Sequence, residues 1–267
     1  MKKKPGYSIQ SFPLSRIFTM DAGRIGLNKH HIKALIEIDV TEPRNIIKSK
    51  RALPGTKISF TSWIIKCIAA ALSEHKEVHA FRKGINKLVI FNSIDISILI
   101  EKKVDGIPVP LPLVIRDANG KGLDVIYNEI ENAKNKAIDE RSGYVIGRSR
   151  RFDPLTLFAL LPQFIRLFAW RIILASPHRA NSMMGSAVVT SVGMAGNADG
   201  WIIPFSIHPV CFALGSIVKK PGVVNDTVEI REYLKMTILM DHDVVDGAPA
   251  ARFVSRLVEL IETGYGL

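Results

Sequence analysis

The sequence predicts an α/β protein, built as a two-layer α+β sandwich in which helices flank a mixed β-sheet. Residues 31–42, "HIKALIEIDVTE", place apolar side chains at every second position, as a half-buried strand does. Residues 59–75, "SFTSWIIKCIAAALSEH", have helical spacing, an alanine-rich buried face and hydroxyl residues suited to cap the first turn. With 267 residues, 47% of them hydrophobic, the chain can bury a sizeable core.

Further elements follow the same two patterns, and no linker is long enough to divide the chain. We therefore expect a single domain over residues 1–267. Residues 105–118, "DGIPVPLPLVIRDA", are rich in proline and are expected to form a connection between elements. The remaining expected strands cover 87–91, 94–100, 186–192, 209–218 and 228–240, and the remaining expected helices cover 122–140 and 248–263.

The chain is basic, with a net charge of +11 and 36 Lys and Arg residues against 25 Asp and Glu. This balance favours anionic partners such as phosphorylated cofactors, acidic carrier domains or a membrane surface. The basic residues are scattered after the opening "MKKK", and no nucleic-acid-binding signature is present. We therefore expect no nucleic acid partner.

The two cysteines, Cys67 and Cys211, lie in apolar runs and have no metal ligands at useful spacing. They are predicted to be buried free thiols in a reducing compartment, and no metal site is expected. The N-terminal lysines are not followed by the apolar run of a signal peptide. We therefore expect a cytoplasmic protein.

The most apolar stretch is residues 154–178, within an expected helical insert at about 150–180. A proline, a glutamine and two arginines interrupt it before it could span a bilayer. The favoured interpretation is a helix packed on the domain or on a neighbouring subunit, and membrane contact through an interfacial helix is the alternative. The expected packed face, opposite Gln163 and Arg166, consists of Phe158, Leu161, Ile165, Phe168, Ile172 and Ile173.

Residues 242–247, "HDVVDG", follow an apolar strand and precede a helix. Strand ends that face helix starts are rigid and open on one side. His242 at this position can act as a general base near neutral pH if a hydrogen bond fixes its tautomer. Gly247 would permit a tight turn. The residues alone leave open whether His242 is catalytic or only satisfies the polar turn.

A second candidate is residues 186–196, "SAVVTSVGMAG". Its strand-like part ends at Thr190 and Ser191, before a glycine-containing turn. Hydroxyl groups at such a bend could hydrogen-bond a developing oxyanion. They could equally cap a helix or bond their own backbone.

The pairing of "DHDVVDGAPAARF" with the upstream "VVTSVGMAG" resembles the catalytic domain of the dihydrolipoamide acyltransferases of 2-oxo acid dehydrogenase complexes. The stretches "HIKALIEIDVTE", "KISFTSWIIKCIAAAL", "DGIPVPLPLVIRDANGKGL" and "HPVCFALGSI" are similar to segments of that family in the same order. The resemblance covers most of residues 30–263. It implies the fold that this family shares with chloramphenicol acetyltransferase.

The resemblance implies a homotrimer, or a multiple of it, with a channel at the subunit interface. Acyl coenzyme A, a substrate, and an acceptor thiol such as dihydrolipoamide would enter this channel from opposite ends. His242 would be the general base that deprotonates the thiol, with its tautomer set by its own backbone carbonyl. Asp246 would be structural and pair with an N-terminal arginine. Thr190, contributed by the neighbouring subunit, would hydrogen-bond the tetrahedral oxyanion.

The chain departs from the family's pattern in several places. Lipoyl and peripheral subunit-binding domains are not expected, nor is a lipoyl lysine, so a lipoyl or other carrier domain would act in trans. The shortened first helix leaves Arg24 as the expected partner of Asp246, with Arg16 behind it. Asp243 stands where the family usually has arginine, which would remove or reverse a local ion pair.

His31 aligns with a residue near the family's acceptor channel, although an ordinary histidine at the start of a strand explains it equally well. We count His31 and Ser191 as candidate substrate-binding residues. Two other functions stay open: a small-molecule O- or N-acetyltransferase that uses the same histidine, and a non-catalytic trimeric scaffold. The intact set of motif residues favours an enzyme.

Overall fold

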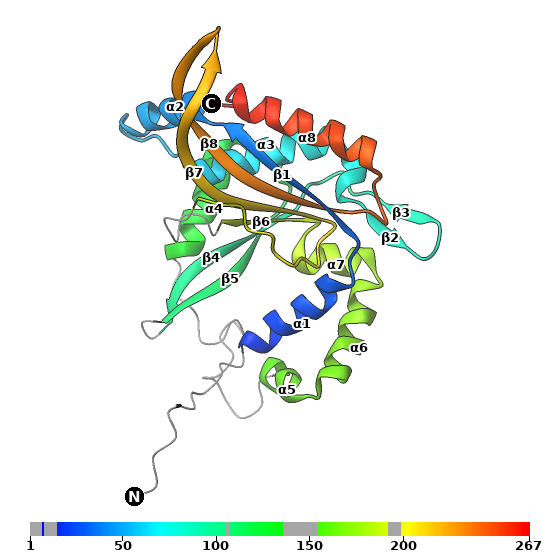
Figure 1. The fold of residues 1–267 in the computed structure, drawn as a ribbon. Helices are drawn as coiled ribbons and strands as arrows, with labels where there is room; N and C mark the ends of the chain where they lie inside the picture. Colours follow the sequence, from blue (N-terminus) through cyan, green and yellow to red (C-terminus); the bar gives the residue numbers. More distant parts are fainter. Residues whose placement is uncertain (1–6, 8–14, 105–106, 136–153, 192–198) are drawn as a thin grey trace, which may run out of the picture.

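The computed structural model describes residue 7 and residues 15–104, 107–135, 154–191 and 199–267. A six-stranded mixed sheet in the order β1-β8-β7-β6-β4-β5 forms one layer, and α3, α4 and α8 pack on one of its faces (Figure 1). β6 runs parallel to both of its neighbours, and the other strand pairs are antiparallel. This arrangement confirms the predicted α/β class.

The strands are β1 (His31–Asp39), β4 (Ile96–Val104), β5 (Ile107–Ile115), β6 (Ala187–Ser191), β7 (Val210–Val224) and β8 (Thr227–Asp241), with a separate hairpin of β2 (Phe81–Lys83) and β3 (Lys87–Val89). The helices are α1 (Ser15–Leu27), α2 (Thr41–Arg51), α3 (Phe60–Glu74), α4 (Leu123–Asn135), α5 (Pro154–Leu160), α6 (Gln163–Leu174), α7 (Pro177–Met184) and α8 (Gly247–Glu262), and a short 3-10 helix covers Lys76–His79.

Helix α3 forms the centre of the core, as its predicted apolar face requires. Ser59 caps it: its hydroxyl accepts from the Ser62 N–H at 3.1 Å, and its own N–H donates to the Ser62 hydroxyl at 3.0 Å. Trp63 is fully buried, and its indole N–H donates to the Tyr265 carbonyl at 2.9 Å. Local capping chemistry and burial therefore agree, and the predicted helix is confirmed.

The proline-rich segment contains a regular strand, β5, where a connection was expected. β5 pairs with β4 and lies at the edge of the described sheet. Pro108, Pro110 and Pro112 occupy alternate positions, so the N–H groups that they lack all belong to the side without a partner strand. An edge strand tolerates this pattern, which a central strand would not.

The sheet face opposite α3 is partly covered by the segment that precedes β7. The Trp201 indole N–H donates to the Ile36 carbonyl at 3.0 Å. The Lys235 ammonium lies 4.3 Å from the centre of the Trp201 ring and pairs with Asp199. Lys235 can be buried in the sheet because the ring and the carboxylate stabilise its charge.

Both cysteines are buried free thiols, as predicted. Burial raises the pKa of Cys67 and of Cys211 to about 12. Both therefore stay protonated near neutral pH and are poor nucleophiles.

The predicted helical insert consists of α5, α6 and α7, and it is tied to α1 by a buried ion pair. Arg166 of α6 donates from Nε to Asp21 Oδ2 at 2.7 Å and from Nη2 to Asp21 Oδ1 at 3.0 Å. Phe18 of α1 stacks on Phe158 of α5, with ring centres 6.0 Å apart. The insert is thus fixed to the N-terminal helix by charge and by aromatic packing.

The predicted orientation of the insert's apolar face is wrong. Ile165, Phe168 and Ile172 of α6 are exposed, whereas Arg166, expected on the opposite and outward face, is buried. A buried carboxylate such as Asp21 needs a charged partner, and this requirement turns the arginine face of α6 inward. No helix in the described ranges is both long enough and apolar enough to cross a bilayer.

Candidate active site

The turn that carries His242 is held rigidly by backbone hydrogen bonds. His242 follows the last residue of β8, and its N–H donates to the His30 carbonyl at 2.9 Å, just before β1. The carbonyl of Asp241 accepts from the N–H groups of Val244 at 3.0 Å and Val245 at 3.1 Å. The chain then enters α8, so a strand end and a helix start fix the histidine backbone from both sides.

The imidazole of His242 is half open to solvent, with 53% of its side chain exposed. Its Nδ1 lies 3.8 Å from Asp246 Oδ1, which is beyond hydrogen-bond distance. Among the described residues the ring makes no hydrogen bond, so the expected bond to its own backbone carbonyl is not formed in this chain. The described residues of one chain therefore do not fix the tautomer of His242.

The expected pairing of Asp246 with Arg24 is not present in the described part of the chain. Asp246 precedes α8 as its N-cap residue, and its side chain is 86% exposed. Arg24, in the last turn of α1, is exposed as well, and neither it nor Arg16 pairs with Asp246. The first helix instead uses Asp21 to bind the insert, so its arginines do not reach the motif.

Gly247, at the first position of α8, does not serve a tight turn as predicted. Its φ lies outside the left-handed region, and a Cβ added there would meet no described atom within 4 Å. Its effect is to leave open space beside the histidine turn.

A buried ion pair that the sequence analysis missed lies directly under the motif. Lys29 Nζ lies 2.5 Å from Asp241 Oδ2, and the Asp241 side chain is buried. The other oxygen of Asp241, Oδ1, accepts from the Asp243 N–H at 3.3 Å. Asp241, immediately before His242, was the sequence signal for this pair, because an Asp at a strand end can hold the following turn.

Asp243 is negative where the family usually has a positive arginine. It pairs with basic side chains, so the charges of the local ion pair are reversed. Its Oδ1 lies 3.0 Å from His30 Nδ1, and its Oδ2 lies 3.3 Å from Arg82 Nη1 of β2. The hydrogen bond to Asp243 raises the pKa of His30, and the same contact lowers the pKa of Asp243. The β2–β3 hairpin is thereby attached beside the turn of His242.

His31 lies beside the motif in the β1–β8 ladder, where its backbone pairs with Asp241. Its Nε2 donates to the His208 carbonyl at 3.1 Å, and burial lowers the pKa of His31. His208, which was not a candidate, is buried, and its Nε2 donates to the Met184 carbonyl at 3.0 Å. Burial lowers the pKa of His208 to about 4. These two neutral rings tie β1 to the end of α7.

Thr190 and His242 of one chain are far apart. Thr190 pairs with Ala213 on β7, which pairs with Thr237 on β8. His242 lies five residues beyond Thr237, so it is about 16 Å further along the strand and about 10 Å away across two strand spacings. A separation of roughly 19 Å excludes a site made by these two side chains within one chain. Ser191, the next residue of β6, is exposed.

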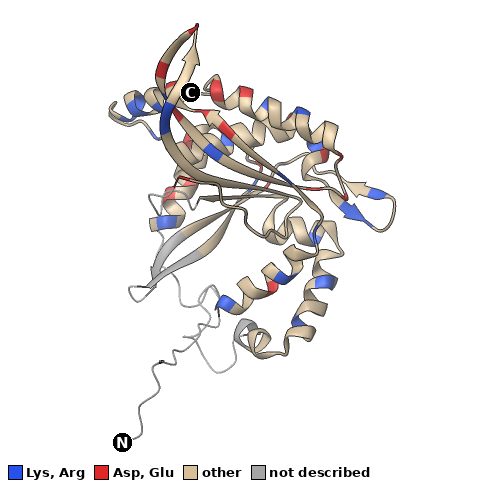
Figure 2. Cartoon of the chain, viewed as in Figure 1, with Lys and Arg blue, Asp and Glu red and all other residues tan. Residues whose placement is uncertain are grey.

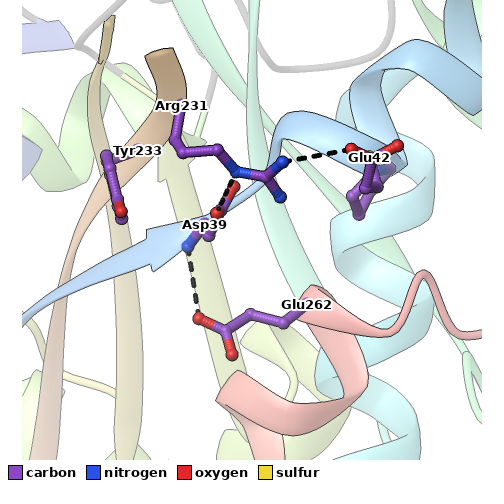
Figure 3. A pocket seen from close by; sticks show the side chains of 6 residues that line it. Asp39, Glu42, Arg231, Tyr233 and Glu262 are labelled. Atoms are coloured by element: carbon purple, nitrogen blue, oxygen red, sulfur yellow. Dashed lines mark hydrogen bonds and ion pairs between the residues drawn. The ribbon is translucent and has the colours of Figure 1, made fainter. Parts of the chain in front are cut away.

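A polar cavity of about 330 Å³ lies at the other end of β1 (Figure 3). In it Arg231 pairs with Asp39 at 2.8 Å and with Glu42 at 3.2 Å, and Glu262 accepts from the Asp39 N–H at 3.3 Å. These groups satisfy one another, and β1 separates them from His31 by about 26 Å. This cavity is therefore not the candidate active site.

The groups around His242 suit proton transfer. The described residues contain no cluster of three or more His, Cys, Asp or Glu side chains that could bind a metal ion. The arrangement instead offers an accessible imidazole on a rigid turn, which can take a proton from a thiol or hydroxyl.

Solved structures share the fold. Chloramphenicol acetyltransferase superposes with a TM-score of 0.50 at 11% identity, covering 96% of this chain and 98% of that chain. The dihydrolipoamide acetyltransferase of Azotobacter vinelandii gives 0.68 at 18% identity, with 98% and 95% covered; the roles of a serine, a histidine and an asparagine in its catalytic mechanism have been investigated. The cubic core of the pyruvate dehydrogenase multienzyme complex gives 0.65 at 18% identity, with 98% and 95% covered. The class of protein is thus the chloramphenicol acetyltransferase-like fold.

Within that class, the 2-oxoacid dehydrogenases acyltransferase catalytic domain matches residues 28–143 and 176–266, and the chain belongs to this family. A relative in Staphylococcus saprophyticus, the dihydrolipoyllysine-residue succinyltransferase component of the 2-oxoglutarate dehydrogenase complex, is 26% identical over 232 residues. The alignment covers 85% of this chain and 45% of that protein, so the chain spans less than half the length of its relative. Residues 1–27 and 144–175, which include α1, α5 and α6, lie outside the family match.

Proposed function

We propose that the protein is an acyltransferase that moves an acyl group between coenzyme A and a thiol acceptor of the dihydrolipoyl type. Membership of the acyltransferase family supports this activity. The observation that carries the proposal is the accessible His242 ring on a turn fixed by the bond to His30 and by the Lys29–Asp241 pair.

In the proposed reaction His242 takes the proton of the acceptor thiol, and the sulfur of that thiol attacks the thioester carbonyl of acyl coenzyme A. The carbonyl oxygen becomes an oxyanion, and the Thr190 hydroxyl donates a hydrogen bond to it. The tetrahedral intermediate then collapses, the bond to the coenzyme A sulfur breaks, and the protonated His242 returns the proton to that sulfur. The reverse direction uses the same groups.

The separation of Thr190 and His242 supports a site shared by two subunits. If His242 and Thr190 act on one substrate, Thr190 must come from a neighbouring copy, as in a homotrimer or a multiple of it. In the Azotobacter vinelandii enzyme the investigated serine lies 52 residues before the histidine and the asparagine four residues after it. Thr190, His242 and Asp246 have the same spacing, which supports their assignment to equivalent positions.

The test is thiol release from a panel of acyl coenzyme A donors, including the acetyl and succinyl forms, with and without dihydrolipoamide. We expect turnover that requires dihydrolipoamide and falls by about 10²–10⁴ in His242→Ala, the range of a lost general base. His178→Ala, an exposed histidine on α7, is the matched control and should keep full activity.

Turnover that ignores dihydrolipoamide but still requires His242 would replace the acceptor in this proposal by a small-molecule hydroxyl or amine. Equal activity of wild type and His242→Ala would overturn the proposal. Absence of turnover in a folded wild-type oligomer would favour a scaffold.

A further inference from the structure

Helices α1, α5 and α6 form a compact unit that the family match does not include, and we call it the accessory unit. It lies at the end of the molecule opposite the tip of the β7–β8 hairpin (Figure 1). The Asp21–Arg166 pair and the Phe18–Phe158 stack hold its helices together. These contacts join the three helices into one unit.

The outer face of the accessory unit is apolar. On α6, Phe164 and Phe168 are 73% and 64% exposed, and Ile165 and Ile172 lie on the same helical face. Leu157 and Leu160 of α5 and Met20 and Leu27 of α1 add further exposed apolar side chains. Exposed apolar side chains gathered on one face of a helix are typical of a contact site for a partner or a membrane.

The described charges beside this face are basic. Residues 1–27 and 144–175 contain ten Lys and Arg and two Asp, and four of the ten, Arg16, Arg24, Arg166 and Arg171, belong to the described helices. Of the two aspartates, Asp21 is buried against Arg166. Arg16 and Arg24 on α1 and Arg171 on α6 are exposed beside the apolar face. In Figure 2 acidic residues are concentrated on the rest of the fold. In the sequence, Asp21 is the one acidic residue within α1, α5 and α6.

We propose that the accessory unit binds the surface of a membrane that contains anionic lipids, with α6 lying in the interface plane. Phenylalanine and isoleucine on one face, flanking arginine, and no exposed acid among the described residues of the accessory unit are the features of an interfacial helix. Exposed arginines can extend along such a face and reach lipid phosphates. The twelve residues of α6 span about 18 Å, well below the roughly 30 Å hydrocarbon core, so the helix lies on the membrane and does not cross it.

A second copy of the chain is the less favoured occupant. In a two-fold contact through this face, the arginines of both copies would meet without exposed described carboxylates between them. Lipid phosphates supply the missing negative charge, and the acyl region receives the aromatic side chains.

The test is flotation of the full chain with vesicles of phosphatidylcholine containing about 30 mol% phosphatidylglycerol, compared with phosphatidylcholine alone. We expect wild type to bind the anionic vesicles and to be released by high salt, because exposed charges are then screened. Phe164→Ser/Phe168→Ser should lower the partition coefficient at least tenfold. Leu53→Ser/Ile85→Ser, which changes two exposed apolar residues outside the accessory unit, is the matched control and should bind like wild type.

Failure of wild type to bind anionic vesicles overturns the proposal, as does equal binding of the phenylalanine variant. Equal binding to both vesicle types overturns the electrostatic part. A change of oligomer size in the phenylalanine variant, measured by light scattering and without vesicle binding by wild type, would assign the face to a second copy. Vesicle binding needs no turnover, so this result is independent of the acyltransferase assay.

Discussion

Asp21 and Arg166 form a buried, two-point ion pair across 145 residues of sequence, with distances of 2.7 and 3.0 Å. The pair joins α1 to α6, and hydrogen bonding to Asp21 raises the pKa of Arg166. The guanidinium also donates to the carbonyls of Ala159 and Leu161 at the end of α5. Arg166 of α6 therefore links α6 to both α1 and α5.

Removing one member of this pair should loosen the accessory unit. Arg166→Met leaves the Asp21 carboxylate buried without a partner, and we expect a loss of about 3–5 kcal/mol in the local free energy of unfolding. Hydrogen exchange should report it as lost protection of the α6 amides, while α3 keeps its protection. Asp21→Leu/Arg166→Met removes both charges and should recover most of the loss. Equal damage in the single and double variants would contradict this account.

Mixing two inactive variants should restore activity if the active site is shared. His242→Ala retains Thr190, and Thr190→Ala retains His242, so a mixed trimer can bring both intact residues to one interface. Random reassembly of equal amounts pairs them at about a quarter of the interfaces, so we expect about a quarter of wild-type turnover. The assay is thiol release after joint unfolding and refolding. Recovery no greater than the sum of the separate variants would place the two residues in different sites.

Thr190→Ala alone should lower kcat by about 10²–10³, the usual effect of one lost oxyanion donor. The Michaelis constants should change little, because the hydroxyl acts on the oxyanion and not on the ground state. Thr190→Ser keeps the donor and should retain most of the rate. Ser191→Ala, the neighbouring hydroxyl, serves as control; a larger effect there would transfer the oxyanion role to Ser191.

The stability of the protein should fall as pH drops below about 6.5. Burial lowers the pKa of His79 and of His208 to about 4, against 6.5 in a model peptide. Between these values the unfolded chain binds more protons than the folded one, so acid favours unfolding. Each of the two histidines should make the free energy of unfolding at pH 5 roughly 2 kcal/mol lower than at pH 7.

Urea unfolding of His208→Gln at pH 7 and pH 5 checks this prediction, since glutamine can still donate to the Met184 carbonyl. The variant should lose roughly 2 kcal/mol less than wild type over that interval. An identical pH dependence would show that His208 does not titrate in this way.

Lys29→Met should impair catalysis by displacing the histidine turn. It leaves Asp241 buried without its cation, and Asp241 holds the backbone on which His242 sits. We expect kcat to fall about 10- to 100-fold, the effect of a small misplacement of a reacting group, with little change in coenzyme A binding. Lys29→Arg should rescue much of the rate. Loss of coenzyme A binding with unchanged kcat would assign Lys29 to the substrate instead.

Much of the fold was predictable because its signals are local. The Ser59 cap, the apolar spacing of α3 and the alternation of β1 are each visible within a short window of sequence. β5 was missed because proline usually signals a break, and only its edge position makes it compatible with a strand. α2 was missed because its sequence, "TEPRNIIKSKR", is mostly polar and buries little beyond Pro43 and Ile47.

The place of His242 in the fold was predictable, and the geometry around it was not. His242 stands at the strand-to-helix turn that the motif indicated. The separation of Thr190 from His242 depends on strand register, and the failure of Arg24 to reach Asp246 depends on where α1 packs. Both are long-range properties that no local pattern contains. The direction of Arg166 is of the same kind, because its partner lies in another helix far along the chain.

The prolines of β5 also limit how copies of this protein can associate. A sheet with two open edges can add strands without end, and such growth leads to fibres. Here Pro108, Pro110 and Pro112 remove the donors from one edge, so a strand of another copy finds no regular partner there. Of the two edges of the described sheet, β1 contains no proline, so the regular pattern of donors is kept on that side. Growth of the sheet through both edges, the route to fibres, is thereby opposed.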